Sequence, residues 1–156
     1  MPLTVPDDFT LVTTNQFNYP LGSFQYAGRI DSVSFDVGIR GLANTADPNK
    51  VADGHPLAPQ ASRMHWNQDL GYIFNNLRIV TDTSIADTLL LTLGTADNLA
   101  RVSLPYSATV ATGSNLSIQL GIDYLAWLAG IDFAAPLPEI KAKIVSNTPN
   151  AFFVLD

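Results

Sequence analysis

The sequence predicts a mainly β protein: a single-domain antiparallel β-sandwich or jelly roll of about eight strands with one or two short helices. Three observations support this fold class. Short apolar runs alternate with polar residues at the period of a strand, turn residues separate these runs, and the residues that favour helix surfaces are scarce. Among 156 residues, Glu occurs once and Lys three times, whereas Asp occurs thirteen times.

The clearest predicted strand covers residues 30–39, where apolar Val33, Phe35 and Val37 alternate with polar residues. Residues 116–120 and 140–144 show the same alternation and predict strands with one wet face. Residues 89–93 are apolar on both faces, which is typical of a central strand. Weaker candidates are residues 9–13, 77–80, 100–104 and 151–155. The expected core consists of Val33, Phe35, Val37, Leu89, Leu91, Leu93, Leu116, Ile118, Leu120, Ile140 and Ile144.

Helices are predicted at two places. At residues 122–129 apolar side chains recur at helical spacing and Gly130 follows, and a shorter helix is expected at residues 61–69. Turn signals lie at residues 82–84, 94–98, 112–115 and 147–150. Residues 41–60 show no periodicity and predict a long ordered loop, and without repeats or linkers we expect one domain over residues 1–156.

Charge and cysteine content exclude several functions. The net charge is −6 and the eight basic residues are scattered, which argues against a nucleic-acid partner. Without Cys there is no disulfide, thiolate nucleophile or Cys metal site. The first residues lack the basic start and apolar run of a secretory signal, and the longest apolar run, residues 124–131, falls short of the about 20 residues that span a bilayer. We therefore expect a soluble protein without a membrane partner.

Motifs for chemistry are weak. The two histidines, His55 and His65, are not accompanied by a nucleophile elbow. On a helix, His65 and Asp69 would share one face and could offer two metal ligands, but no further ligands are indicated nearby. Residues 47–54 carry oxygen donors and a Gly without calcium-loop spacing, so cation binding there stays open. We predict no catalytic residue, no cofactor and no metal site.

One segment resembles an active site. Residues 82–89 resemble the catalytic segment of retroviral-type aspartic proteases, and residues 120–125 resemble a later element of that family. The resemblance implies a dimer in which paired Asp82 carboxylates activate water. Ser84 stands where the family has Gly, and the 39 positions from Asp82 to Gly121 leave little chain for a substrate-covering flap. A non-enzymatic protein is therefore the favoured interpretation, with the protease as a less favoured alternative.

The surface composition favours an assembly role. Interfaces favour aromatic residues and avoid Lys and Glu. The residues expected to bind a partner lie in the two ends and in the long loop: Phe9, Phe17, Tyr19, Asp47, Pro48, His55, Pro56, Phe152 and Phe153.

The whole chain, β-rich with many Asp, Asn, Thr and Pro residues and no Cys, resembles the capsid decoration or cement proteins of tailed bacteriophages. The resemblance implies a non-enzymatic virion structural protein, made in the host cytoplasm and placed on the capsid surface. Such a protein would bind the major capsid protein or other virion subunits and bridge them, as a homo-oligomer. The alternatives are another tail or fibre component and a carbohydrate-binding β-sandwich.

Overall fold

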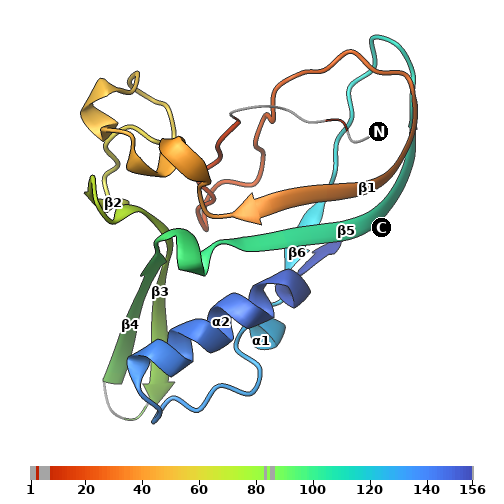
Figure 1. Ribbon diagram of the computed structural model, residues 1–156. Helices are drawn as coiled ribbons and strands as arrows, with labels where there is room; N and C mark the ends of the chain where they lie inside the picture. Colours follow the sequence, from red (N-terminus) through yellow and green to blue (C-terminus); the bar gives the residue numbers. More distant parts are fainter. Residues whose placement is uncertain (1–2, 4–7, 83, 85–86, 156) are drawn as a thin grey trace.

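The computed structural model describes residues 3, 8–82, 84 and 87–155. Within these residues the chain is mainly β, with seven strands in antiparallel sheets, and it is consistent with a single-domain β-sandwich (Figure 1). The predicted fold class is confirmed. None of the described helices is long and apolar enough to cross a membrane.

The longest sheet is a curved ribbon of two strands (Figure 1). Strand β1 (Gly28–Val37) pairs antiparallel with β5 (Ala100–Val110), and the register shifts between Ile30 and Ser32. Val102 and Leu104 are buried on one face of β5, while Arg101 and Ser103 are exposed. This alternation confirms the strands predicted at residues 30–39 and 100–104 and gives the ribbon one polar face.

A second sheet is a hairpin with a short third strand. Strand β3 (Gly71–Asp82) pairs with β4 (Asp87–Gly94), and β2 (His65–Asn67) pairs with the beginning of β3. The strands predicted at residues 77–80 and 89–93 are therefore confirmed. The central position predicted for residues 89–93 is wrong, because β4 lies at the edge of its sheet, paired among the described residues with β3 alone, and Leu90 is 67% exposed. Before β2, the predicted loop contains two 3-10 helices, η1 (Gly41–Thr45) and η2 (Pro48–Lys50), and a third, η3 (Ala96–Asn98), follows β4.

The C-terminal part combines helices with a third sheet. Strand β6 (Leu120–Ile122) pairs with β7 (Phe152–Val154), which confirms a strand in residues 151–155. Helix α1 (Tyr124–Trp127) begins after Asp123, whose side chain accepts hydrogen bonds from the backbone of Leu125 and Ala126. This confirms the helix predicted at residues 122–129. Helix α2 (Leu137–Ala151) packs against α1 and leads directly into β7 (Figure 1).

The strand predicted at residues 140–144 is wrong, because these residues lie in α2. Ile140 and Ile144 fit the period of two, but with Thr148 and Ala151 they also fit a helical face, and all four are buried. The turn predicted at residues 147–150 lies in the same helix, with Pro149 in its last turn. Burial of one helical face has overridden the local turn signal.

Three further elements differ from expectation. Residues 9–13 contain no strand, and of residues 116–120 only Leu120 lies in one. The helix predicted at residues 61–69 is wrong: β2 runs through it and ends in a turn, where the Asn67 side chain accepts hydrogen bonds from the backbone of Asp69 and Leu70. The turn predicted at residues 82–84 lies partly outside the described residues, and so does the predicted protease segment.

The core lies where α1 and α2 pack on the β3–β4 hairpin. Its buried cluster is Leu91, Leu93, Trp127, Ile140, Ile144 and Ala151. Four of these were predicted from sequence. Val33, Phe35 and Val37 are only half-buried, and so are Leu116 and Ile118, while Leu120 is exposed. Phe35 nevertheless joins the ribbon to the C-terminal sheet, since its ring packs edge to face on that of Phe152, with the ring centroids 5.2 Å apart.

Candidate functional site

The long loop and the β2–β3 hairpin meet at Tyr72, at the start of β3. Its backbone N–H donates a hydrogen bond to the Asn44 side chain of η1 (3.0 Å), and its hydroxyl donates to the Leu57 carbonyl (2.7 Å). Tyr72 is 3% exposed, and Asn44 and Leu57 are buried with it. One tyrosine therefore fixes two distant points of the loop onto the hairpin.

Close backbone approach makes this junction possible. Gly71 adopts φ +73°, and a Cβ atom there would collide with Asn44. On the facing strand, a Cβ atom at Gly94 would collide with the Trp66 ring and with the Tyr72 carbonyl. Larger residues at either position would push the loop or β2 away from β3.

His65 lies in β2, and its ring packs on Tyr72. The two ring centroids are 4.7 Å apart with an interplanar angle of 66°. The backbone of β2 is held from outside by Arg63, which donates to the carbonyls of His65 (2.9 Å) and Trp66 (2.6 Å). Among the described residues, the buried Nε2 atom of His65 has no hydrogen-bond partner. The site therefore holds an imidazole in place with one nitrogen unpaired.

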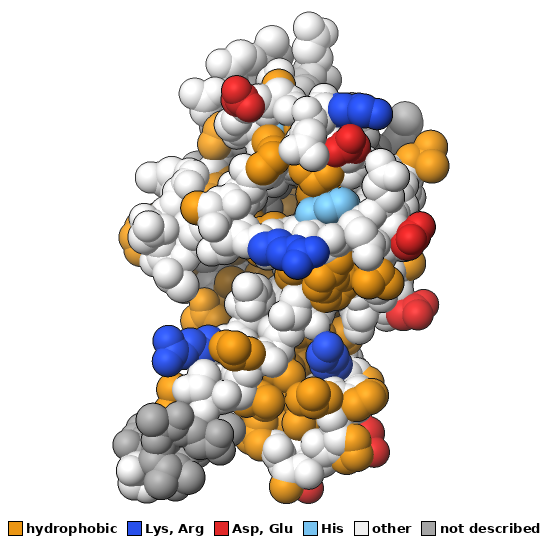
Figure 2. Space-filling model, turned by 90° about the vertical axis from the view of Figure 1, so that its left-hand side faces the viewer, with side chains coloured by type: hydrophobic (Ala, Val, Ile, Leu, Met, Phe, Trp, Pro, Cys, Tyr) orange, Lys and Arg blue, Asp and Glu red, His pale blue; other side chains and the backbone are white. Residues whose placement is uncertain are grey.

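His55 lies in the loop, two residues before Leu57, whose carbonyl accepts the Tyr72 hydroxyl. Its Nδ1 accepts a hydrogen bond from the Leu57 backbone N–H (3.1 Å). Its ring packs edge to face on that of Phe9, with the ring centroids 6.1 Å apart. Gln60 secures this turn, because its side-chain amide donates to the carbonyls of His55, Pro56 and Ala58 at 3.2, 3.2 and 2.9 Å. On the face seen in Figure 2, a histidine is visible among charged and hydrophobic side chains.

The electrostatics of the junction keep Tyr72 neutral. Burial raises the pKa of the Tyr72 hydroxyl, and the negative charge of Asp47 raises it further. Asp47 is held by its cap of η2, where its side chain accepts from the Asn49 backbone N–H (3.0 Å). Tyr72 can therefore act as a hydrogen-bond donor near neutral pH, but not as a base.

The predicted pairing of His65 with Asp69 on a helical face is wrong, since the two residues lie on a strand and in the following turn. In the described part of the chain, no group of three or more His, Cys, Asp or Glu side chains could hold a metal ion. A closed zinc or calcium site built from such residues is therefore not formed there.

The residues predicted to bind a partner are spread over the molecule. Phe9, Asp47, Pro48, His55 and Pro56 lie in or against the loop. Phe17 is 85% exposed, and the Tyr19 hydroxyl is bonded within its own segment, to the Gln16 carbonyl. At the other end, Phe152 packs against Phe35 and Trp127, whereas Phe153 is exposed.

Sequence reasoning missed Tyr72, Asn44 and Gln60, which build the junction. Their roles depend on contacts with residues up to 28 positions away, and no local pattern carries that information. One signal was present: His65 and Trp66 lie a few residues before Gly71 and Tyr72, at the spacing of a short hairpin.

The fold and this junction define the class: a β-rich domain in which a long loop carrying His55 packs on a hairpin carrying His65. The chain belongs to the MbnP family, whose model matches residues 4–144. The matched range includes both histidines, Tyr72 and the whole β1–β5 ribbon, and it ends inside α2. Comparison with curated proteins and with solved structures found no match.

Proposed function

We propose that this chain is a metal-binding protein that holds a copper ion at the junction of the long loop and the β2–β3 hairpin. The observation that carries the proposal is the unpaired, buried Nε2 of His65. A buried polar atom without a partner is costly, and a metal ion would remove that cost by taking the nitrogen lone pair. Packing on Tyr72 already fixes the ring, which lowers the entropy lost on binding.

The donor chemistry favours copper over other metals. Imidazole suits copper, and the chain supplies neither thiolates nor, among its described residues, a carboxylate cluster for zinc, calcium or magnesium. Met64, a residue with a soft thioether, directly precedes His65. Membership in the MbnP family supports copper in particular, because this family is related to methanobactin and copper binding.

The two histidines differ in whether a ring nitrogen is available to bind a metal. His65 offers a free nitrogen in its present position. The Nδ1 atom of His55 accepts a hydrogen bond from the Leu57 backbone N–H, so the neutral imidazole carries its own proton on Nε2 and has no free lone pair on either nitrogen. It fits a metal only if it gives up that hydrogen bond. We therefore expect His65 to be the main protein ligand and His55 a secondary one.

Competitive titration with a chromophoric copper chelator, under reducing conditions without oxygen, tests the proposal. The wild-type chain should bind one copper ion, and His65→Gln should weaken binding by about tenfold or more. His55→Gln is the matched variant and should weaken it less. Unchanged copper binding in His65→Gln would overturn the assignment of His65 as a ligand, and equal binding of zinc by the wild type would overturn the preference for copper.

The predicted role in a virion stays a prediction. Three large apolar side chains, those of Phe17, Leu42 and Leu125, are 85, 90 and 85% exposed, and a partner that covered them would bury apolar surface. Electron microscopy and light scattering of the purified chain would test it. Assemblies that disappear when Phe17 and Leu42 are both replaced by Ser would support it, whereas a strictly monomeric wild type would remove homo-oligomerisation from the proposal.

A further inference from the structure

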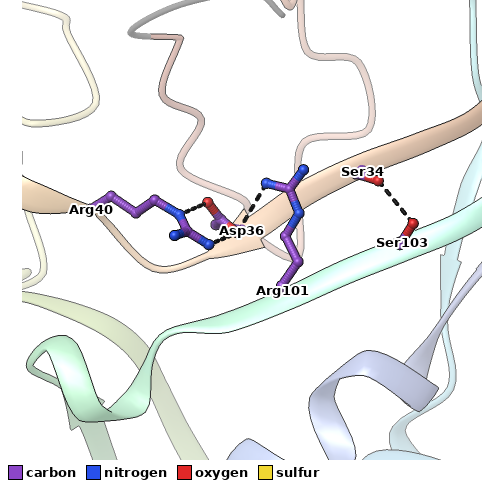
Figure 3. A network of polar contacts seen from close by, with 5 residues as sticks. All are labelled: Ser34, Asp36, Arg40, Arg101 and Ser103. Atoms are coloured by element: carbon purple, nitrogen blue, oxygen red, sulfur yellow. Dashed lines mark hydrogen bonds and ion pairs between the residues drawn. The ribbon is translucent and has the colours of Figure 1, made fainter. Parts of the chain in front are cut away.

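Two arginines share one carboxylate on the polar face of the β1–β5 ribbon (Figure 3). Arg40 donates to both oxygens of Asp36, through Nε and Nη2, and Arg101 donates to Oδ1 through Nη1 at 3.3 Å. The Asp36 side chain is 16% exposed, whereas those of Arg40 and Arg101 are 59 and 58% exposed. The carboxylate thus lies beneath two guanidinium groups that face solvent.

This cluster carries an excess of positive charge. Asp36 neutralises one of the two arginines, so one positive charge remains in a chain whose net charge is −6. Each guanidinium group has five N–H donors, and only three of the ten are used on Asp36. Because Asp36 already orients both groups, a ligand that binds them loses little side-chain entropy.

A further donor lies beside the arginines. Asp36 is paired with Arg101 in the ribbon, and Ser34 is paired with Ser103 on the same face. The Ser34 hydroxyl donates to the Ser103 oxygen (2.9 Å; Figure 3), and Ser103 is exposed, so its own hydroxyl can donate to a ligand. A row of outward-facing donors therefore runs along β5 from Arg101 to Ser103.

We propose that Arg40 and Arg101 form a binding site for a ligand carboxylate, supplied by a small organic acid or by an acidic side chain of a peptide. The single excess charge matches one carboxylate better than a phosphate dianion. The planar guanidinium groups match the two oxygens of a carboxylate, as Arg40 already does with Asp36. This site is separate from the copper proposal and does not depend on it.

Nuclear magnetic resonance of the arginine Nε–Hε groups tests the site on the full chain. Acetate represents the small acid, a blocked Gly-Asp-Gly peptide the side chain, and inorganic phosphate the competing anion, all at constant ionic strength. The Arg40 and Arg101 signals should shift and saturate with one or both carboxylate probes, and the stronger probe identifies the source. Loss of a charge-assisted hydrogen bond in Arg101→Gln or Arg40→Gln should weaken binding by about tenfold.

Arg29 provides the matched control. It is also on β1 and pairs with an acidic residue, Asp31, but no second arginine joins that pair among the described residues. Arg29→Gln should leave the titration unchanged, although it removes the same charge. Arg101→Lys keeps the charge and should still weaken binding, because it loses the planar donor pair. Shifts that do not saturate, equal shifts at Arg29, or phosphate binding as tightly as carboxylate would each overturn the proposal.

Discussion

Two regions of this protein are held together in different ways. In the lower half of Figure 1, α1 and α2 pack on the β3–β4 hairpin, and the side chains of Leu91 and Ile144 are fully buried. In the upper half, residues 41–64 contain few buried side chains, and side-chain hydrogen bonds from Asn44, Gln60 and Tyr72 add to the backbone hydrogen bonds that hold the segment. Apolar burial therefore determines stability, and polar contacts determine the geometry around the histidines.

The largest effect should come from the apolar region. Ile144→Ala removes a fully buried side chain from the centre of the α2 face and should lower the free energy of unfolding by about 3–4 kcal/mol. Chemical denaturation measures this loss in the free energy of unfolding. Leu90→Ala, at a 67% exposed position of β4, is the matched control and should change stability by less than about 0.5 kcal/mol. A loss in Ile144→Ala no larger than in this control would contradict the location of the core.

Removing a buried polar anchor should have an intermediate effect. Asn44→Ala leaves the Tyr72 backbone N–H buried without a partner, at a cost of about 1–3 kcal/mol. It should also weaken copper binding, because the loop loses one of its attachments to the hairpin. Asn76→Ala, at an exposed position of β3, serves as the control in both denaturation and copper titration. Wild-type copper affinity in a folded Asn44→Ala protein would show that this anchor does not shape the site.

The Asp36 cluster should make stability depend on acid. Hydrogen bonding from Arg40, reinforced by Arg101, holds the pKa of Asp36 below its usual value of 3.8 and outweighs the opposing effect of burial. A lowered folded-state pKa gives stability that is present above 3.8 and lost as the pH falls through the folded value. Asp36→Asn should therefore cost about 1 kcal/mol at pH 7, with the exposed arginines limiting the effect, and less below pH 3.8. Chemical denaturation of both proteins at a series of pH values checks this. A difference in the free energy of unfolding between wild type and Asp36→Asn that does not depend on pH would refute it.

The smallest effect on stability should come from Gln60. Gln60→Ala leaves three carbonyls that can accept hydrogen bonds from water instead. The free energy of unfolding should therefore fall by only about 0.5 kcal/mol. Amide hydrogen exchange should nevertheless become faster at Leu57 and Ala58, because the turn around His55 loses its brace. If exchange there is unchanged, the side chain does not hold the turn.

Strands could be predicted from the sequence where buried apolar residues alternate with exposed polar residues along the chain. In β1 and β5 apolar and polar residues alternate at the spacing of a strand, and the structure has strands there. Residues 140–151 could not be assigned in this way. Their apolar positions fit two periods, and the choice came from Trp127, whose indole N–H donates to Thr148 (3.0 Å) inside the core and holds that helical face inward.

By itself, the sequence determined the mainly β class, the long loop, the short helix before Gly130 and the absence of thiol chemistry. Composition and local periodicity are properties of neighbouring residues, so these features needed no tertiary information. Only the tertiary structure decided that His65 packs on Tyr72, that the Tyr72 hydroxyl bonds to Leu57 next to His55 in the loop, and that Arg40 and Arg101 meet at Asp36. Those groups come together through strand register and loop docking, which depend on contacts up to 65 positions apart in the chain.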